Sequence, residues 1–279
     1  MKKQILVITD YDRNETKALE KANDIAQRFD ADIEVIAFVD DSVGDLAIDQ
    51  QYQVLSQQVT DHFAFGLQVS VQVLQTNDLV NWLQQHCQTK NIDLVIKTAN
   101  PGKTWFHTPT DWQLIRQLKC PVLLASSQKW RPKSTILAAV DSGNNQDKQR
   151  HIDSKVLSAA DEWRVVNGHE LHTVYSVPKP TASLELDLIE LDEFKRSVLP
   201  KSKQSLSELV GNSGIDDVIE HIEFGAPEKR IPSKANHIKA DLVVIGSIGR
   251  TGLSGHLLGN TAEKVLNNLR TDILVIKPD

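Results

Sequence analysis

The chain of 279 residues repeats itself, and this repeat constrains its fold more than any other feature. Three apolar segments of the first half recur in the same order in the second half, at offsets of 131, 148 and 151 residues. They pair 4–10 with 135–141, 93–97 with 241–246, and 120–125 with 271–276. Because chance rarely preserves such an order, the sequence predicts two similar units. The polar, proline-bearing segment 126–133 lies between them and suits a linker.

Within each half, short apolar runs alternate with segments of helical spacing. Runs of Val, Ile and Leu without polar alternation are typical of strands buried on both faces, as in a parallel sheet. We expect strands at 4–9, 32–39, 67–74, 93–97 and 122–125, and again at 135–140, 170–175, 217–223, 242–246 and 273–276. Such alternation predicts doubly wound sheets, which bind ligands at the carboxyl ends of their strands, where the strand order reverses.

Composition excludes several classes of protein. With 40% hydrophobic and 24% charged residues the chain fits a globular protein, and no apolar run approaches the roughly 20 residues that cross a bilayer. The first residues lack the features of a signal peptide. A net charge of −6 gives no basic footprint for nucleic acid or anionic lipid. Cys87 and Cys120 lie far apart in the sequence and fit free thiols, so we expect a cytoplasmic location.

A glycine-rich segment follows the strand at 242–246. Five of the thirteen glycines fall within the fourteen residues 246–259, in a G-x2-G-x9-G pattern that leads into a helix expected at 261–269. Glycines allow several backbone N–H groups to converge on one anion, and a helix N-terminus adds partial positive charge. This predicts a phosphate-binding loop; a glycine-rich surface turn is the alternative. Asn260 and Thr261 could add side-chain donors.

Asp141 ends the first strand of the second half, and the topology places it near this loop. Its carboxylate could accept hydrogen bonds from ribose hydroxyls or help to hold a divalent ion, or it could simply cap the following helix. The end of the next strand, at Val174, would form the adjacent wall, where backbone groups could contact an adenine edge.

The glycine pattern after Asp-Leu-Val-Val-Ile, on the fourth strand of an α/β unit, resembles the ATP-binding signature of the universal stress protein family. Ser247 and Leu257-Leu258-Gly259 also fit that signature. Thr108-Pro109-Thr110-Asp111-Trp112 resembles the N-terminal domain of the tandem, UspE-like subgroup. Nucleotide-binding members often have Ser or Thr directly after the last glycine, where this chain has Asn260.

The resemblance implies two tandem Rossmann-like domains of the adenine nucleotide alpha hydrolase type, each a five-stranded parallel sheet flanked by helices. They would span 1–129 and 134–279 and pair as an internal pseudo-dimer. It further implies a stress-tolerance role and ATP, or another adenine nucleotide, bound with Mg²⁺ or Mn²⁺. The residues it implies as nucleotide-binding are Asp141, Val174, Gly246, Ser247, Gly249, Gly259, Asn260 and Thr261. Protein partners and a homodimer are further expectations.

The matching loop of the first half differs. Gly102-Lys103-Thr104 suggests a Walker A motif, but Lys97 stands where that motif needs a glycine, and Pro109 interrupts the helix that should follow. We therefore interpret this loop as a degenerate copy without a nucleotide site. Lys97 and Lys103 fit a solvated pair better than an anion site.

No motif supplies covalent or metal chemistry, and no residue is evidently placed to activate a water molecule. We therefore expect a regulatory binding protein, at most a slow ATPase. Two alternatives stay open: a slow nucleotide hydrolase or nucleotidyl transferase using the same loop, and an interaction or apolar-ligand protein in which both nucleotide sites are lost. Residues 181–207, apolar at helical spacing, would cover the second sheet or line an apolar cavity.

Overall fold

The computed structural model describes residues 2–10, 16–39, 41–99, 109–167, 169–178, 188–247 and 260–278. The chain forms two compact units, residues 1–127 and 128–279, here called the N-half and the C-half. In the described ranges, no helix combines the length and apolar character of a membrane span.

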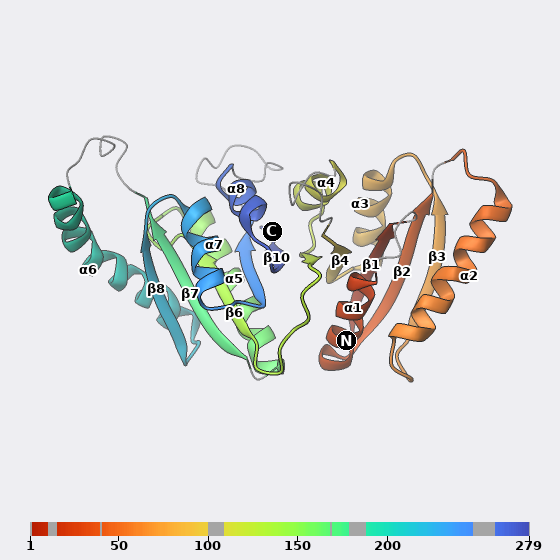
Figure 1. Ribbon diagram of the computed structural model, residues 1–279, viewed down its shortest axis with the longest axis horizontal. Helices are drawn as coiled ribbons and strands as arrows, with labels where there is room; N and C mark the ends of the chain where they lie inside the picture. Colours follow the sequence, from red (N-terminus) through yellow and green to blue (C-terminus); the bar gives the residue numbers. More distant parts are fainter. Residues whose placement is uncertain are drawn as a thin grey trace. The chain divides into compact units, whose positions relative to one another are not determined.

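The N-half is a parallel five-stranded sheet in the order β3-β2-β1-β4-β5. Helices α1 and α2 contact each other, as do α3 and α4 (Figure 1). The elements are β1 (Lys3–Asp10), α1 (Lys17–Phe29), β2 (Ala31–Val39), α2 (Asp45–His62), β3 (Val69–Gln75), α3 (Leu79–Lys90), β4 (Leu94–Thr98), α4 (Pro109–Gln117) and β5 (Val122–Ala125).

The C-half repeats this topology with the strand order β10-β9-β6-β7-β8. Here α5 contacts α6, and α7 contacts α8. The elements are β6 (Thr135–Val140), α5 (Asp147–Asn167), β7 (Glu170–Val177), α6 (Leu188–Ser213), β8 (Val218–Phe224), α7 (Pro227–His237), β9 (Leu242–Gly246), α8 (Asn260–Asn268) and β10 (Asp272–Ile276). The expected fold class is confirmed, and all ten strands lie within two residues of their predicted limits.

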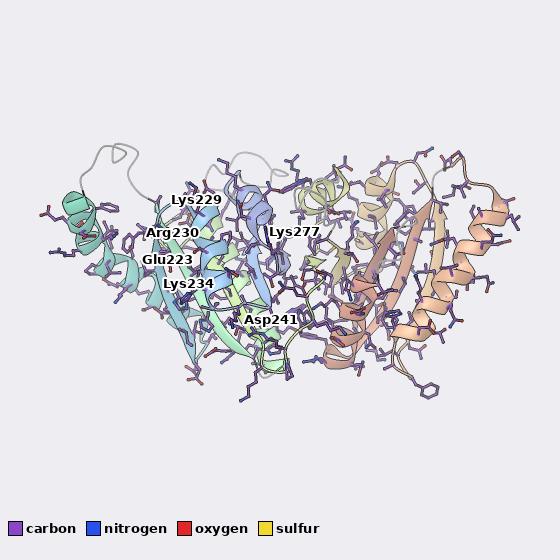
Figure 2. All side chains as sticks on the ribbon, in the orientation of Figure 1. Glu223, Lys229, Arg230, Lys234, Asp241 and Lys277 are labelled. Atoms are coloured by element: carbon purple, nitrogen blue, oxygen red, sulfur yellow. The ribbon has the colours of Figure 1, made fainter. Side chains whose placement is uncertain are left out.

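The burial of the strands explains why their sequences read as continuous apolar runs. Every residue of β4, β5, β6 and β10 is buried, because helices cover both faces of the sheet. The outer strands β3 and β8 are less covered and carry polar residues. An ion pair of 2.8 Å between Glu223 of β8 and Lys234 of α7 fastens a helix over that outer part (Figure 2).

The linker is attached to the C-half by a side chain. The guanidinium of Arg131 donates to both carboxylate oxygens of Asp241, at 2.8–3.2 Å. Asp241 precedes β9 (Figure 2) and also accepts from the backbone N–H of Thr135 at 2.9 Å, where β6 begins. Because one carboxylate joins the linker to the starts of two central strands, the linker folds as part of this unit.

Helix α6 contains most of the segment that was expected to cover the second sheet. Its C-terminal part buries Ser202, Leu206 and Val210, and the helix contacts β8 and β7. This supports the covering role for residues 202–210, while 181–187 lie outside the described residues.

Candidate functional site

The C-half has its strand-order reversal between β6 and β9. From β6 the chain continues to β7 on one side, and from β9 it continues to β10 on the other. Val140 and Gly246, the last residues of β6 and β9, each lie one position beyond the paired residues Ala139 and Ile245. The carboxyl ends of two such strands flank the crevice where doubly wound sheets bind ligands. Asp141 and Ser247 follow directly at this edge.

A buried carboxylate holds Asp141 in place. The backbone N–H of Asp141 donates to Oδ1 of Asp153 at 3.2 Å, and Nε2 of Gln149 donates to the same oxygen at 2.9 Å. Asp153 and Gln149 lie on α5 and are buried, whereas Asp141 is only half-buried. The helix that follows β6 therefore fixes the backbone of Asp141 and leaves its side chain at the edge of the sheet.

Asp153 is itself an unusual acid. Burial raises the pKa of its carboxyl group to about 7, because an ionised carboxylate loses most of its hydration there. The two hydrogen bonds lower the pKa, and the negative charge of Asp141 raises it further. Sequence reasoning missed this residue. Its signal was an aspartate on the apolar face of α5, between Ile152 and Val156.

Gly246 is required at the end of β9 by close packing. A Cβ atom at this position would lie 2.7 Å from Cγ1 of Ile152 and 3.6 Å from Cγ2 of Val156. Side chains do not approach that closely, so only glycine allows α5 to contact this strand end. Helix α5 also carries Asp153. The close contact of Gly246 with α5 therefore sets the distance between β9 and the carboxylate of Asp153.

The remaining loop residues are placed as follows. Ser247 is buried, and its backbone N–H donates to the carbonyl of Ile276 at 3.0 Å, so this amide serves the sheet rather than an anion. Asn260 and Thr261 begin α8, whose first N–H groups have no partner within the helix and carry partial positive charge. Gly249 and Gly259 lie outside the described residues.

Val174 is not at the end of its strand. It pairs with Ala139 on one side and His221 on the other, and it is fully buried. The β6–β7 pairing ends at Val140 and Tyr175, so Ser176 is the first residue of β7 to extend past β6. The end of β7 was expected near Tyr175 and lies at Val177, so this wall extends two residues farther along the chain.

A buried hydroxyl next to Asp141 lacks a partner. Among the described residues, Oγ of Ser142 is buried and makes no hydrogen bond. The backbone carbonyl of Ser142 accepts from the hydroxyl of Ser205 on α6, which anchors the turn. A Cβ atom on Gly143 would collide with the hydroxyl of Tyr175, so this turn packs directly on β7. An unsatisfied hydroxyl beside a carboxylate suits a polar ligand.

The N-half has filled the corresponding place. Thr98 ends β4 where Gly246 ends β9, and its hydroxyl accepts from the backbone N–H of Ala18 at 3.1 Å. Ala18 lies in the first turn of α1, whose N-cap residue Thr16 makes no side-chain capping bond. Thr98 therefore fixes the start of the helix that follows β1, whereas Gly246 leaves room for the side chains of Ile152 and Val156.

A buried ion pair further distinguishes the N-half. Nζ of Lys97 on β4 lies 3.2 Å from Oδ1 of Asp111 on α4, with side-chain exposures of 2% and 0%. The interpretation of Lys97 as a solvated lysine is therefore wrong. Its ammonium is neutralised inside the protein, because α4 brings a carboxylate from fourteen residues farther along the chain. Lys103 lies outside the described residues.

Another concave surface lies at the opposite edge of the C-half. This groove of about 880 Å³ is lined by the linker, the starts of β9 and β10, and the ends of α7 and α8. Two of its cations, Lys239 and Arg270, follow the C-termini of α7 and α8, whose partial charge is negative. These two cations offset the helix dipoles. Within the described ranges, no cluster of three or more His, Cys, Asp or Glu side chains could hold a metal ion.

Together, the duplicated five-stranded sheets and the polar edge at β6 and β9 define a tandem α/β protein of the Rossmann-like class. The family model for the universal stress protein family matches residues 1–126 and 134–277, and the chain belongs to that family.

The similarity extends over the full length of tandem relatives. The chain is 30% identical over 301 residues to universal stress protein E of Photorhabdus laumondii, covering 99% of this chain and 95% of the relative. It is 28% identical over 300 residues to universal stress protein E of Escherichia coli K12, covering 100% and 95%. The chain is thus a tandem, UspE-like member.

Solved structures agree with this assignment. A protein of Pseudomonas aeruginosa UCBPP-PA14 attributed to the universal stress proteins superposes with a TM-score of 0.76 at 30% identity, covering 99% of this chain and 94% of that one. A universal stress protein of Archaeoglobus fulgidus has a TM-score of 0.68 at 20% identity, covering 98% of each chain, which supports the fold.

Proposed function

We propose that the C-half binds an adenine nucleotide at the carboxyl ends of β6 and β9, in a regulatory, stress-related role. The observation that carries this proposal is the polar edge at the strand-order reversal. There Asp141 is held by Asp153, the adjacent Ser142 has a buried hydroxyl that makes no hydrogen bond to a described residue, and Gly246 leads into the glycine-rich segment.

Each part of this edge suits one part of a nucleotide. The carboxylate of Asp141 would accept hydrogen bonds from ribose hydroxyls, and Ser142 would donate to a nearby oxygen. The first N–H groups of α8, with Asn260 and Thr261, would bind phosphate oxygens together with Gly249 and Gly259. The base would lie against β7, at Ser176 just beyond Val174. A divalent cation, Mg²⁺ or Mn²⁺, would accompany the phosphates and neutralise part of their charge.

We propose a regulatory rather than catalytic role because the side chains at this edge bind rather than activate. Asp141 is half-buried, and the only other carboxylate at this site among the described residues, Asp153, already accepts two hydrogen bonds at Oδ1. The cytoplasmic location stays a prediction.

The test has two stages. Small molecules released from gently purified protein are identified first, and ATP with Mg²⁺ is then titrated into the protein by calorimetry. Each hydrogen bond to a charged oxygen contributes about 1.5–3 kcal/mol. A valine side chain at position 259 would keep phosphate oxygens away from the backbone N–H groups, so Gly259→Val should weaken ATP binding at least about tenfold. Gly44→Val is the matched control, because a Cβ there meets no atom within 4 Å.

The outcomes separate the alternatives. Wild-type protein that releases no nucleotide and gives no heat with ATP would remove the proposal and favour an interaction or apolar-ligand protein. Turnover of radiolabelled ATP above trace rates, lost in Asp141→Ala, would instead favour a slow hydrolase.

A further inference from the structure

The N-half brings its two cysteines together, although 33 residues separate them in the sequence. Cys87 lies in the last turn of α3 and is buried, while Cys120 lies between α4 and β5 and is partly exposed. Their side chains interact with each other. One turn earlier on α3, Nε2 of Gln84 donates to the carbonyl of Gln117 at 3.0 Å, which fastens α3 to the end of α4 close to Cys120.

We propose that Cys87 and Cys120 form a redox modification site, a thiol pair that low-molecular-weight disulfides oxidise reversibly to an intramolecular disulfide. The argument is geometric. A disulfide needs two sulfur atoms already in contact and a backbone that holds them there. The thiol contact provides the first, and the Gln84–Gln117 hydrogen bond together with the packing of α3 on α4 provides the second.

The chemistry balances as two thiol–disulfide exchanges. The Cys120 thiolate attacks one sulfur of the external disulfide, forms a mixed disulfide and releases one external thiolate. Cys87 then loses its proton, attacks the Cys120 sulfur and displaces the second external thiolate. The protein dithiol is oxidised by two electrons, and the external disulfide is reduced to two thiols.

The environments of the two cysteines assign their roles. The contact with Cys120, together with burial, raises the pKa of the Cys87 thiol, so Cys87 stays protonated and inaccessible in the reduced protein. Cys120, partly exposed, is the thiol that an external reagent reaches. Cys87 becomes the attacking group only after Cys120 has been modified.

The new bond would cross-link two segments of the N-half. It closes a loop that contains β4 and α4, and therefore both members of the Lys97–Asp111 ion pair. Cross-linking a loop of this length restricts the unfolded chain, so the oxidised protein should melt at a temperature higher by about 5 °C or more.

The experiment treats the full-length protein with glutathione disulfide and then measures intact mass, free thiols under denaturing conditions, and Tm. The chain has two cysteines, so an intramolecular disulfide has a single assignment. We expect both thiols to disappear, the mass to fall by two hydrogens, Tm to rise, and dithiothreitol to reverse all three changes.

The single variants test the division of roles. Cys87→Ser should accumulate a glutathione adduct on Cys120 without a rise in Tm. Cys120→Ser should leave Cys87 unmodified while the protein is folded. The proposal is overturned if both wild-type thiols stay titratable, if wild-type protein stops at the mixed adduct, or if the only disulfide joins two chains. None of these results depends on nucleotide binding.

Discussion

The two halves end their fourth strands differently. In the C-half, Gly246 leaves α5 in direct contact with the strand, and Asp153 on that helix holds the backbone of Asp141. In the N-half, β4 ends in Thr98, whose hydroxyl accepts a hydrogen bond from the first turn of α1. At the same strand end, one repeat thus has a buried carboxylate on the neighbouring helix, and the other has a hydroxyl that holds a helix start.

The difference shows where a duplicated fold is free to change. The strands keep their order and burial in both halves, because the sheet depends on them. The side chains at the strand ends take no part in the backbone pairing of the sheet, so they can differ between the two copies without loss of the fold. Four substitutions test this comparison, from the largest expected effect to the smallest.

Replacing Lys97 with Met should destabilise the N-half by about 3–5 kcal/mol, because Asp111 would be left buried without its ion-pair partner. Hydrogen exchange measured by mass spectrometry should show lost protection in β4 and α4. The double variant Lys97→Met, Asp111→Leu should recover most of the loss, since an apolar pair needs no charge compensation. A single variant as well protected as wild type would mean that the pair is structurally unimportant.

Replacing Asp153 with Asn should remove a pH dependence from the C-half. The folded-state pKa of about 7 lies above the ordinary value of 3.8, so the folded protein holds the proton more tightly than the unfolded chain. The contribution of the protonated Asp153 side chain to the free energy of unfolding is fully present below about pH 4. About 2–4 kcal/mol of it is lost as the pH rises to 7. In urea unfolding at pH 5–8, the free energy of unfolding should therefore decline less with pH in the variant than in wild type.

Asp147→Asn is the control for this experiment, because Asp147 lies exposed on the same helix. In this variant the free energy of unfolding should decline with pH as it does in wild type. An unchanged decline in Asp153→Asn would show that Asp153 does not titrate in this range.

Replacing Gly246 with Ala should push Ile152 away from β9, since the new Cβ would lie 2.7 Å from it. Overpacking of this kind costs about 1–3 kcal/mol. Because Ile152 precedes Asp153, we also expect weaker ATP binding by calorimetry. Adding Ile152→Ala should relieve the clash, so the double variant should be less destabilised than the sum of the two single variants. Strict additivity would contradict the packing argument.

Replacing Thr98 with Val should destabilise the N-half by about 1–2 kcal/mol, because the N–H of Ala18 loses its acceptor at the helix start. Thr98→Ser keeps the hydroxyl and should cost less. Thermal melting measures both, and ATP affinity should be unchanged in each. A fall in ATP affinity would show that the N-half contributes to binding.

The sequence predicted the fold well for a physical reason. Strands such as 135–140 and 242–246 are buried on both faces, so they appear as apolar runs with clear limits. The candidate site was predicted less completely. Asp141 and Gly246 were found because strand ends and glycine patterns are local signals. Asp153 and Ser142 were missed because only their surroundings distinguish them from ordinary polar residues.

Periodicity and repetition by themselves determined that this chain forms two parallel α/β sheets with a ligand edge expected in the second. Such signals persist in a single sequence, because burial acts on every residue of a strand. Tertiary structure alone decided that Lys97 is buried with Asp111, that Asp153 holds Asp141, and that Cys87 meets Cys120. Each of these contacts joins residues from different elements, and their chemistry depends on hydration and distances that exist only once the chain has folded.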